Sequence, residues 1–363
     1  MWICHFIGTL NFQQEGLILI MILSNQPSHQ SKDTLRIALP SDGAMYDPTK
    51  AFLDKCGIHI ERVNSRRYTA TIRGIPNCVI LFQRAADITS KVEEGSADIG
   101  IVGLDRFSEQ RHESSQAVLV IDDLQYSRCE LTVAVPTSWI DVDCMNDLVD
   151  VSLEFRQRGK TLRIATKYPK LVRSFLAKHG ISYFNLIQAS GTLEIAPQMG
   201  YSDMITDITS TGSTLRENHL KPIVDGTILK SQACLIANPN LTKTSKLMIK
   251  TAKEILDRIE ASLSAREFFR LSVNIEGQSE KDIALKLQEK EALQGLFGPT
   301  IAKVYPQDGA SVFSVTLMIQ RSKLLDAVND FRTIGGFSIS VNQLDYLFYA
   351  TSKSFEQFQS HFS

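Results

Sequence analysis

Residues 204–220 read Met-Ile-Thr-Asp-Ile-Thr-Ser-Thr-Gly-Ser-Thr-Leu-Arg-Glu-Asn-His-Leu, which predicts a short strand, a loop of small residues and a helical turn in succession. The loop carries no bulky side chain, so its backbone N–H groups and hydroxyls can converge on one anion. A helix that starts after the loop adds free N–H donors and a favourable dipole. The loop residues are Thr209, Ser210, Thr211, Gly212, Ser213 and Thr214.

Two carboxylates come just before this loop. Asp203 and Asp207 can accept hydrogen bonds from sugar hydroxyls, so phosphate donors and acids together indicate a phosphorylated sugar as ligand. The alternative for both acids is that they cap a helix or a turn, and the sequence favours this alternative more for Asp203 than for Asp207. A run of small polar residues, taken alone, is more often a surface turn.

The loop resembles the phosphoribosyl-pyrophosphate (PRPP) loop of phosphoribosyltransferases. The segments around it resemble the ATP phosphoribosyltransferases, which catalyse the first step of histidine biosynthesis. Six segments follow the family order over about residues 35–238, and the chain after them resembles the regulatory domain of the long form of the family. The matching segments are LRIALP (35–40), RAADI with GSADIGIVGLD (84–88 and 95–105), CELTVAVP (129–136), RIATKYP (163–169), GTLEIAP (191–197) and 203–215.

The resemblance implies a pentosyltransferase that moves ribosyl 5-phosphate from PRPP to N1 of ATP, releases pyrophosphate and is inhibited by histidine. It implies that residues 209–214 hold the 5′-phosphate and that Asp203 and Asp207 lie near the ribose hydroxyls. It also implies Mg²⁺ carried mainly by the substrate phosphates, no dedicated protein metal site, and a homo-oligomer, a hexamer in the long form. The alternative is a non-catalytic cytoplasmic regulator that binds a small molecule in the same cleft.

Two further residues are candidates for catalysis by this resemblance. Arg84 can stabilise the departing pyrophosphate through paired hydrogen bonds from its guanidinium group. A surface ion pair is an equally good interpretation of Arg84. Glu194 is an active-site acid by the family pattern, or an acid that the dipole of a helix favours in its first turn.

Five residues that follow predicted strands are expected to border the cleft. Ligands bind beyond the carboxyl ends of strands in open α/β sheets. Glycine after a strand lets a substrate approach the backbone, and lysine can contact phosphate; a turn and an exposed cation are the alternatives. These cleft residues are Gly103, Asp105, Thr166, Lys167 and Tyr168.

One stretch departs from the family. A Lys-Gly-Arg triplet usually follows the first strand, where it supplies positive charge to the substrates. Here the residues in its place include an acid and an alanine. They are Ser41, Asp42, Gly43, Ala44 and Met45. Substitute cations are available at Arg66, Arg67 and Arg128.

Alternation of strand and helix signals predicts an α/β protein with mostly parallel sheets. Two lobes of the periplasmic-binding-protein type II architecture are expected, followed by an ACT-like or ferredoxin-like regulatory domain. The expected division is lobe I at 32–135 and 222–270, lobe II at 136–221, and the regulatory domain at 271–363. By the resemblance, three residues of the last domain lie near the effector, namely Leu296, Thr300 and Gly336.

Composition narrows the functional classes. The 363 residues carry a formal net charge of −1, which argues against nucleic-acid binding over a large basic surface. Six cysteines without metal-type or disulfide-type spacing favour the cytoplasm. An apolar run at 17–23 is too short to cross a membrane. Residues 1–31 precede the family resemblance and are expected to be disordered or a misassigned extension.

Overall fold

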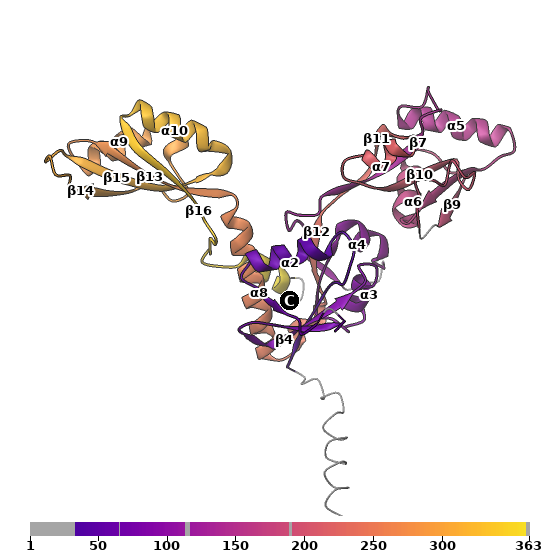
Figure 1. Ribbon diagram of the computed structural model, residues 1–363, viewed down its shortest axis with the longest axis horizontal. Helices are drawn as coiled ribbons and strands as arrows, with labels where there is room; N and C mark the ends of the chain where they lie inside the picture. The colour runs from indigo at the N-terminus through magenta and orange to yellow at the C-terminus, as the bar shows by residue number, and fades with distance from the viewer. Residues whose placement is uncertain (1–32, 65, 113–116, 189–190, 361–363) are drawn as a thin grey trace, which may run out of the picture.

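The computed structural model describes residues 33–64, 66–112, 117–188 and 191–360, which fold into three α/β units (Figure 1). The predicted extension at 1–31 lies outside these residues. Lobe I contains a seven-stranded sheet with the order β2-β3-β4-β1-β5-β12-β6. Its elements are β1 (Leu35–Pro40), α2 (Tyr46–Lys55), β2 (Ile60–Glu61), β3 (Thr69–Ile72), β4 (Ile75–Gln83), α3 (Ile88–Glu93), β5 (Ile99–Gly103), α4 (Leu104–Gln110), β6 (Val118–Ile121), β12 (Ala233–Ala237), the 3₁₀ turn η1 (Pro239–Lys243) and α8 (Lys246–Ala265).

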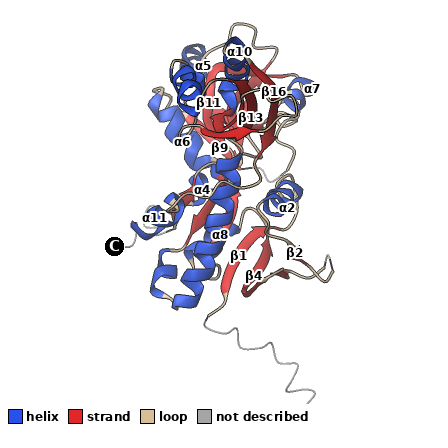
Figure 2. Cartoon of the chain, turned by 90° about the vertical axis from the view of Figure 1, so that its left-hand side faces the viewer, coloured by secondary structure: helices blue, strands red, loops and turns tan. Residues whose placement is uncertain are grey.

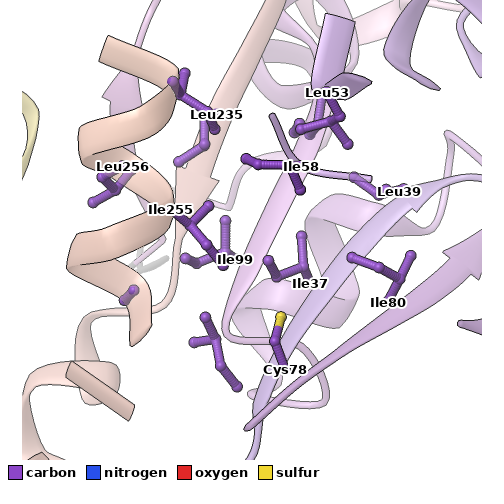
Figure 3. Close-up of a cluster of buried hydrophobic side chains, with 14 of the residues drawn as sticks. Ile37, Leu39, Leu53, Ile58, Cys78, Ile80, Ile99, Leu235, Ile255 and Leu256 are labelled. Atoms are coloured by element: carbon purple, nitrogen blue, oxygen red, sulfur yellow. The ribbon is translucent and has the colours of Figure 1, made fainter. Parts of the chain in front are cut away.

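The core of lobe I lies between this sheet and α8. Strand β1 pairs in parallel with both β4 and β5, which places Ile37 beside Ile80 and Ile99. Figure 3 shows these side chains packed toward Ile255 of α8, and all four are almost fully buried. Burial of such a side chain contributes roughly 1.5–3 kcal/mol. The apolar spacing that predicts a long amphipathic helix near residues 244–269 is confirmed by α8.

Lobe II contains a five-stranded sheet with the order β11-β7-β10-β8-β9. Its elements are β7 (Cys129–Pro136), α5 (Met145–Gln157), β8 (Leu162–Thr166), α6 (Pro169–Lys178), β9 (Phe184–Gln188), β10 (Met204–Thr209), α7 (Ser213–Glu217) and β11 (Leu220–Ser231). The predicted lobe boundaries at 135/136 and 221/222 therefore need correction. Strands β7 and β11 pair with each other, and β7 pairs with β10, so lobe II extends over about 129–231.

The two lobes share one arrangement of residues, at β1 of lobe I and at β8 of lobe II. Residues 34–38 and 161–165 both read Thr-Leu-Arg-Ile-Ala. In lobe I, Arg36 donates from its backbone and guanidinium nitrogens to Asp98 at 2.8–3.1 Å. In lobe II, Arg163 binds Asp203 in the same way at 2.8–3.2 Å. Each pair ties the amino end of β1 or β8 to the start of a neighbouring parallel strand, β5 or β10.

The third unit has the ferredoxin-like order of elements and sheet order β14-β15-β13-β16. Helices α9 and α10 cover the apolar face of this antiparallel sheet. Its elements are β13 (Phe268–Glu276), α9 (Glu280–Gln288), η2 (Glu291–Leu293), β14 (Thr300–Val304), β15 (Val312–Gln320), η3 (Arg321–Lys323), α10 (Leu324–Thr333) and β16 (Gly336–Gln343).

The last helix, α11 (Lys353–Ser360), corrects the predicted domain at 271–363. It leaves the third unit and packs on α8 of lobe I, as Figure 2 shows. Phe355 and Phe358 join the core of lobe I, and α11 also contacts the edge strand β6. Within the described part of the chain, no helix is both long and apolar enough to cross a membrane.

Candidate active site

The candidate site lies where the carboxyl ends of strands from both lobes meet. In lobe II, β8 and β10 are parallel and pair Thr166 with Thr206, so the residues that follow them are adjacent. Lys167 Nζ lies 3.9 Å from Asp207 Oδ2, and the Asp207 side chain is 11% exposed. The other oxygen of Asp207 accepts a hydrogen bond from the Ile208 N–H at 2.8 Å. A carboxylate and an ammonium group thus stand side by side just before the loop.

Two more charged residues, Glu194 and Arg106, affect the pKa of Asp207. Burial raises the pKa of the Asp207 carboxyl above its usual range, and the nearby Glu194 raises it as well. The Ile208 N–H, Lys167 and Arg106 act in the opposite direction. Arg106 comes from lobe I, so the charge of Asp207 is set by groups from both sides of the cleft.

The loop at 209–214 has a fixed internal geometry. Gly212 adopts a φ of 70°, a left-handed conformation that glycine adopts readily, and its N–H donates to Thr209 Oγ1 at 2.8 Å. Thr211 Oγ1 and Ser213 Oγ lie 2.9 Å apart. The helix that the sequence predicts after the loop is α7, which starts at Ser213, within the last two residues of the loop. The hydroxyls and amides of the loop therefore gather at the carboxyl end of β10, next to Asp207.

Asp203 is not part of this cluster. It precedes β10, whereas the loop follows it, so the six residues of the strand separate them by about 20 Å. Both oxygens of Asp203 are engaged by Arg163. The prediction that Asp203 lies near the ribose is therefore corrected, and its carboxylate instead fastens two strands together.

Three of the predicted cleft residues form a joint between the lobes. Tyr168 donates from its hydroxyl to Asp105 Oδ2 at 2.7 Å, and Ser231 Oγ donates to Asp105 Oδ1 at 2.7 Å. Burial raises the pKa of the Tyr168 phenol, and the Asp105 charge raises it further. A Cβ on Gly103 would collide with the Asp105 carboxylate. Gly103, Asp105 and Tyr168 are buried where the two lobes touch, so their predicted place at the border of the cleft stays a prediction.

Thr166 is also buried, and its hydroxyl accepts the Tyr168 N–H at 3.0 Å. Only Lys167 of this segment reaches the charged cluster. Arg106 is the residue that sequence reasoning missed. Its guanidinium carbon lies 4.7 Å from the centre of the Tyr168 ring, which holds the cation at the cleft. The sequence could have indicated Arg106, because it lies three residues after β5, at a strand end where ligands bind in such sheets.

Lobe I places further cations at the matching edge. Since β4, β1 and β5 are parallel, Arg84, Ser41 and Arg106 all lie beyond the same ends of their strands. Arg84 is exposed directly after β4. Of the expected substitutes for the triplet, Arg128 is paired with Asp123 at 2.8 Å. Arg66 and Arg67 are exposed on the loop before β3.

A cavity of about 110 Å³ opens beside the ends of β1 and β4. Arg62 stacks on the Phe82 ring at 4.1 Å and donates to the Tyr46 hydroxyl at 3.3 Å. Lys50 of α2 also lines this cavity. The two cations suit the phosphates of a nucleotide, which carry negative charge.

The predicted effector residues are not all together. The Leu296 N–H donates to the Met318 carbonyl on β15, and Thr300 begins β14. Gly336 begins β16 at the other edge of the sheet. Three strand spacings of about 4.8 Å separate these edges by roughly 14 Å. Within one chain, Leu296 and Thr300 therefore lie close to β15, whereas Gly336 lies at the opposite edge of the sheet from both.

The chain is similar to known proteins over most of its length. Residues 84–261 match the model of the ATP phosphoribosyltransferase family. ATP phosphoribosyltransferase 1, chloroplastic, from Arabidopsis thaliana is 35% identical over 323 residues, which cover 87% of this chain and 78% of that protein. The chain belongs to the ATP phosphoribosyltransferase family.

Bacterial relatives agree with this assignment. The ATP phosphoribosyltransferase of Bradyrhizobium sp. (strain ORS 278) is 33% identical over 86% of this chain and 94% of that protein. That of Brucella anthropi is 44% identical over 56% of this chain and 90% of that protein. The predicted family and the predicted transferase of histidine biosynthesis are thereby confirmed, and the ATP phosphoribosyltransferase reaction is the activity of this family.

Proposed function

We propose that residues 209–214 and Asp207 bind PRPP in lobe II while ATP enters from lobe I. The contact between Asp207 and Lys167 beside the loop carries this proposal. A phosphate on the loop would place the pentose hydroxyls over a carboxylate that can accept their hydrogen bonds. N1 of ATP attacks the anomeric carbon of PRPP. The bond between this carbon and the pyrophosphate oxygen breaks, and its electron pair leaves with that oxygen.

Positioning and charge supply most of what this displacement needs. Aligning two bound reactants is worth up to about 7–11 kcal/mol, and preorganised charges stabilise the oxocarbenium-like centre and the leaving group. Arg84 and Arg106 lie at the lobe I edge, where cations can neutralise pyrophosphate, and Lys167 can contact phosphate from lobe II. Glu194, next to Asp207, adds negative charge toward the developing positive centre.

Mg²⁺ is proposed as part of the PRPP substrate. The donors near the loop are the carboxylates of Asp207 and Glu194, and magnesium commonly uses one or two carboxylates together with substrate phosphates. This donor set fits such an ion. When bound, Mg²⁺ offsets phosphate charge and orients the pyrophosphate oxygens.

Arg62 and Lys50 are proposed to supply the charge that the missing triplet provides elsewhere in the family. The support is their shared cavity at the end of β1, which the half-buried Tyr46 also lines. Arg62→Gln should raise the KM for ATP about 10- to 100-fold, as expected for a charged hydrogen bond. Adding Asp42→Lys and Ala44→Arg to that variant should restore most of the affinity. An unchanged KM for ATP in Arg62→Gln would reject the proposal.

Histidine inhibition through the third unit is also proposed, with Leu296 and Thr300 beside β15 as the effector-binding side. Because Gly336 lies at the far edge, a site that includes all three would need a second chain. The proposed homo-oligomer, a hexamer by family resemblance, would provide one. Sedimentation velocity with and without histidine tests both points, and a monomer insensitive to histidine would contradict them.

A cytoplasmic location is proposed from the chemistry of the cysteines. All five cysteines among the described residues are free, as suits a reducing compartment. One Arabidopsis relative is named chloroplastic, so a plastid is the alternative. Microscopy of a fusion to the full chain distinguishes the two.

The overall function is tested by a pyrophosphate-release assay. Release should require PRPP, ATP and Mg²⁺ together, and histidine should slow it. The competing hypothesis, a non-catalytic regulator, predicts that ligands bind but that no pyrophosphate appears under any combination.

A further inference from the structure

Helices α4 of lobe I and α6 of lobe II meet end to end, and Figures 1 and 2 show them close together where the two lobes meet. We infer that this junction is the joint that sets the angle between the lobes, with Glu109 and Lys170 as positioning residues for ribosyl transfer. The inference rests on the proposed function of the cleft. Neither residue belongs to the sites described above.

Glu109 of α4 caps the start of α6. The N–H groups of Lys170 and Leu171 donate to its two carboxylate oxygens at 2.8 and 2.9 Å. The first N–H groups of a helix have no partner within the helix, and negative charge is favourable at that end. Glu109 therefore satisfies two donors that belong to the other lobe.

Lys170 of α6 in turn caps the carboxyl end of α4. Its Nζ donates to the carbonyl oxygens of Ser108 and Arg111 at 3.3 and 2.6 Å. These carbonyls lie at the carboxyl end of α4, where cations are favoured. The two helices thus exchange caps, and four hydrogen bonds join the lobes at one point. We call this set of contacts the α4–α6 clasp.

The clasp lies next to the groups that face the substrates. Along α4, Asp105 binds Tyr168, and Arg106 stacks on the same ring. Arg106 also acts on the charge of Asp207 across the cleft. A change in the angle between α4 and α6 would therefore shift the Arg106 cation relative to Asp207. Because reactant alignment governs the transition state, the clasp should matter more for kcat than for binding PRPP to lobe II alone.

The test compares Glu109→Gln and Lys170→Met with Lys170→Arg, which keeps the charge and the donors. Steady-state kinetics, thermal unfolding and small-angle scattering with and without PRPP and ATP are measured on the full chain. The first two variants should lose about tenfold in kcat with less than a twofold change in the KM for PRPP. Their scattering profiles should differ from the native one, and Lys170→Arg should keep most of the native kcat.

Glu154→Gln is the matched control. Glu154 forms an exposed ion pair with Arg158 inside lobe II, so its loss should leave kcat and scattering unchanged. A lower Tm for Glu109→Gln with native kcat and scattering would overturn the inference, because it would show a purely structural cap. If the native protein releases no pyrophosphate, the proposed function fails, and the scattering comparison still decides whether the clasp sets the lobe angle.

Discussion

Two aspartates four positions apart have opposite roles in this protein. Asp203 directly precedes β10 and Asp207 lies near its carboxyl end, and residue type alone does not separate them. Their positions do, because Asp203 precedes β10 and is bound by Arg163, whereas Asp207 stands beside the loop and Lys167. Sequence patterns singled out the loop and Asp207, but they did not reveal that Arg163 already binds both oxygens of the Asp203 carboxylate.

This difference gives the first prediction. Asp207→Asn should lower kcat/KM about 10- to 100-fold, because a charged hydrogen bond is worth about 1.5–3 kcal/mol, and should leave the Tm unchanged. Asp203→Asn is the control and should lower the Tm while kcat stays native. Equal kinetic losses in both variants would contradict the assignment.

The glycine of the loop gives a second prediction at the same scale. Gly212 and Gly200 have φ values of 70° and 74°, so alanine at either position should cost about 1–2 kcal/mol of stability. Only Gly212→Ala should also raise the KM for PRPP, since Gly212 lies within the loop. Titration of PRPP into both variants checks this, and equal affinities would count against the loop as the phosphate site.

At the scale of elements, periodicity and capping residues predicted which segments are strands and helices. Pro169 is the first residue of α6, Gly180 follows the end of that helix, and Ser279 caps α9 by accepting the Asp282 N–H. Pairing partners were not predictable, because an apolar run such as β11 fits either lobe until its register with β7 is known. The place of α11 was missed for the same reason.

Helix α11 is fastened by Glu260 of α8. Four hydrogen bonds from Ser352, Lys353 and Ser354 reach this carboxylate. Burial alone would raise the pKa of Glu260, but these hydrogen bonds outweigh it and lower the pKa below the ordinary value of 4.5. A lowered pKa in the folded state means stability that is present above pH 4.5 and is lost as pH falls through the folded-state pKa.

Glu260→Gln should therefore destabilise the protein by about 1–2 kcal/mol at pH 7, and the difference from the native protein should shrink on acidification below about pH 4.5. Glu254→Gln, on the same helix with Arg258 as an exposed partner, should cost less than about 0.5 kcal/mol. Denaturant unfolding at several pH values measures both. A pH-independent loss in Glu260→Gln would show that its charge is not involved.

At the scale of the whole molecule, the chain passes between units more often than a linear division predicts. Lobe I is built from residues near 33–121 and 233–265 and is completed by α11, which follows the third unit. The third unit is thus connected to lobe I at both of its ends, through α8 and through the segment that leads to α11. Sequence periodicity does not show that a later segment such as α11 packs on an earlier unit.

Removal of residues 344–363 should therefore destabilise lobe I even though these residues follow the third unit. Phe355 and Phe358 are at least nine-tenths buried against its core, and loss of one buried phenylalanine typically costs about 3–5 kcal/mol. Hydrogen exchange should speed up in β6 and α8 but not in lobe II. Native exchange in lobe I would contradict this view of α11.

The central claim is that the loop at 209–214 binds the 5′-phosphate of PRPP beside Asp207. A crystal structure with PRPP and Mg²⁺ tests it most directly. We predict the 5′-phosphate within hydrogen-bond distance of the loop N–H groups and the ribose hydroxyls at the Asp207 carboxylate. PRPP bound elsewhere, with this loop facing only solvent, would contradict the account.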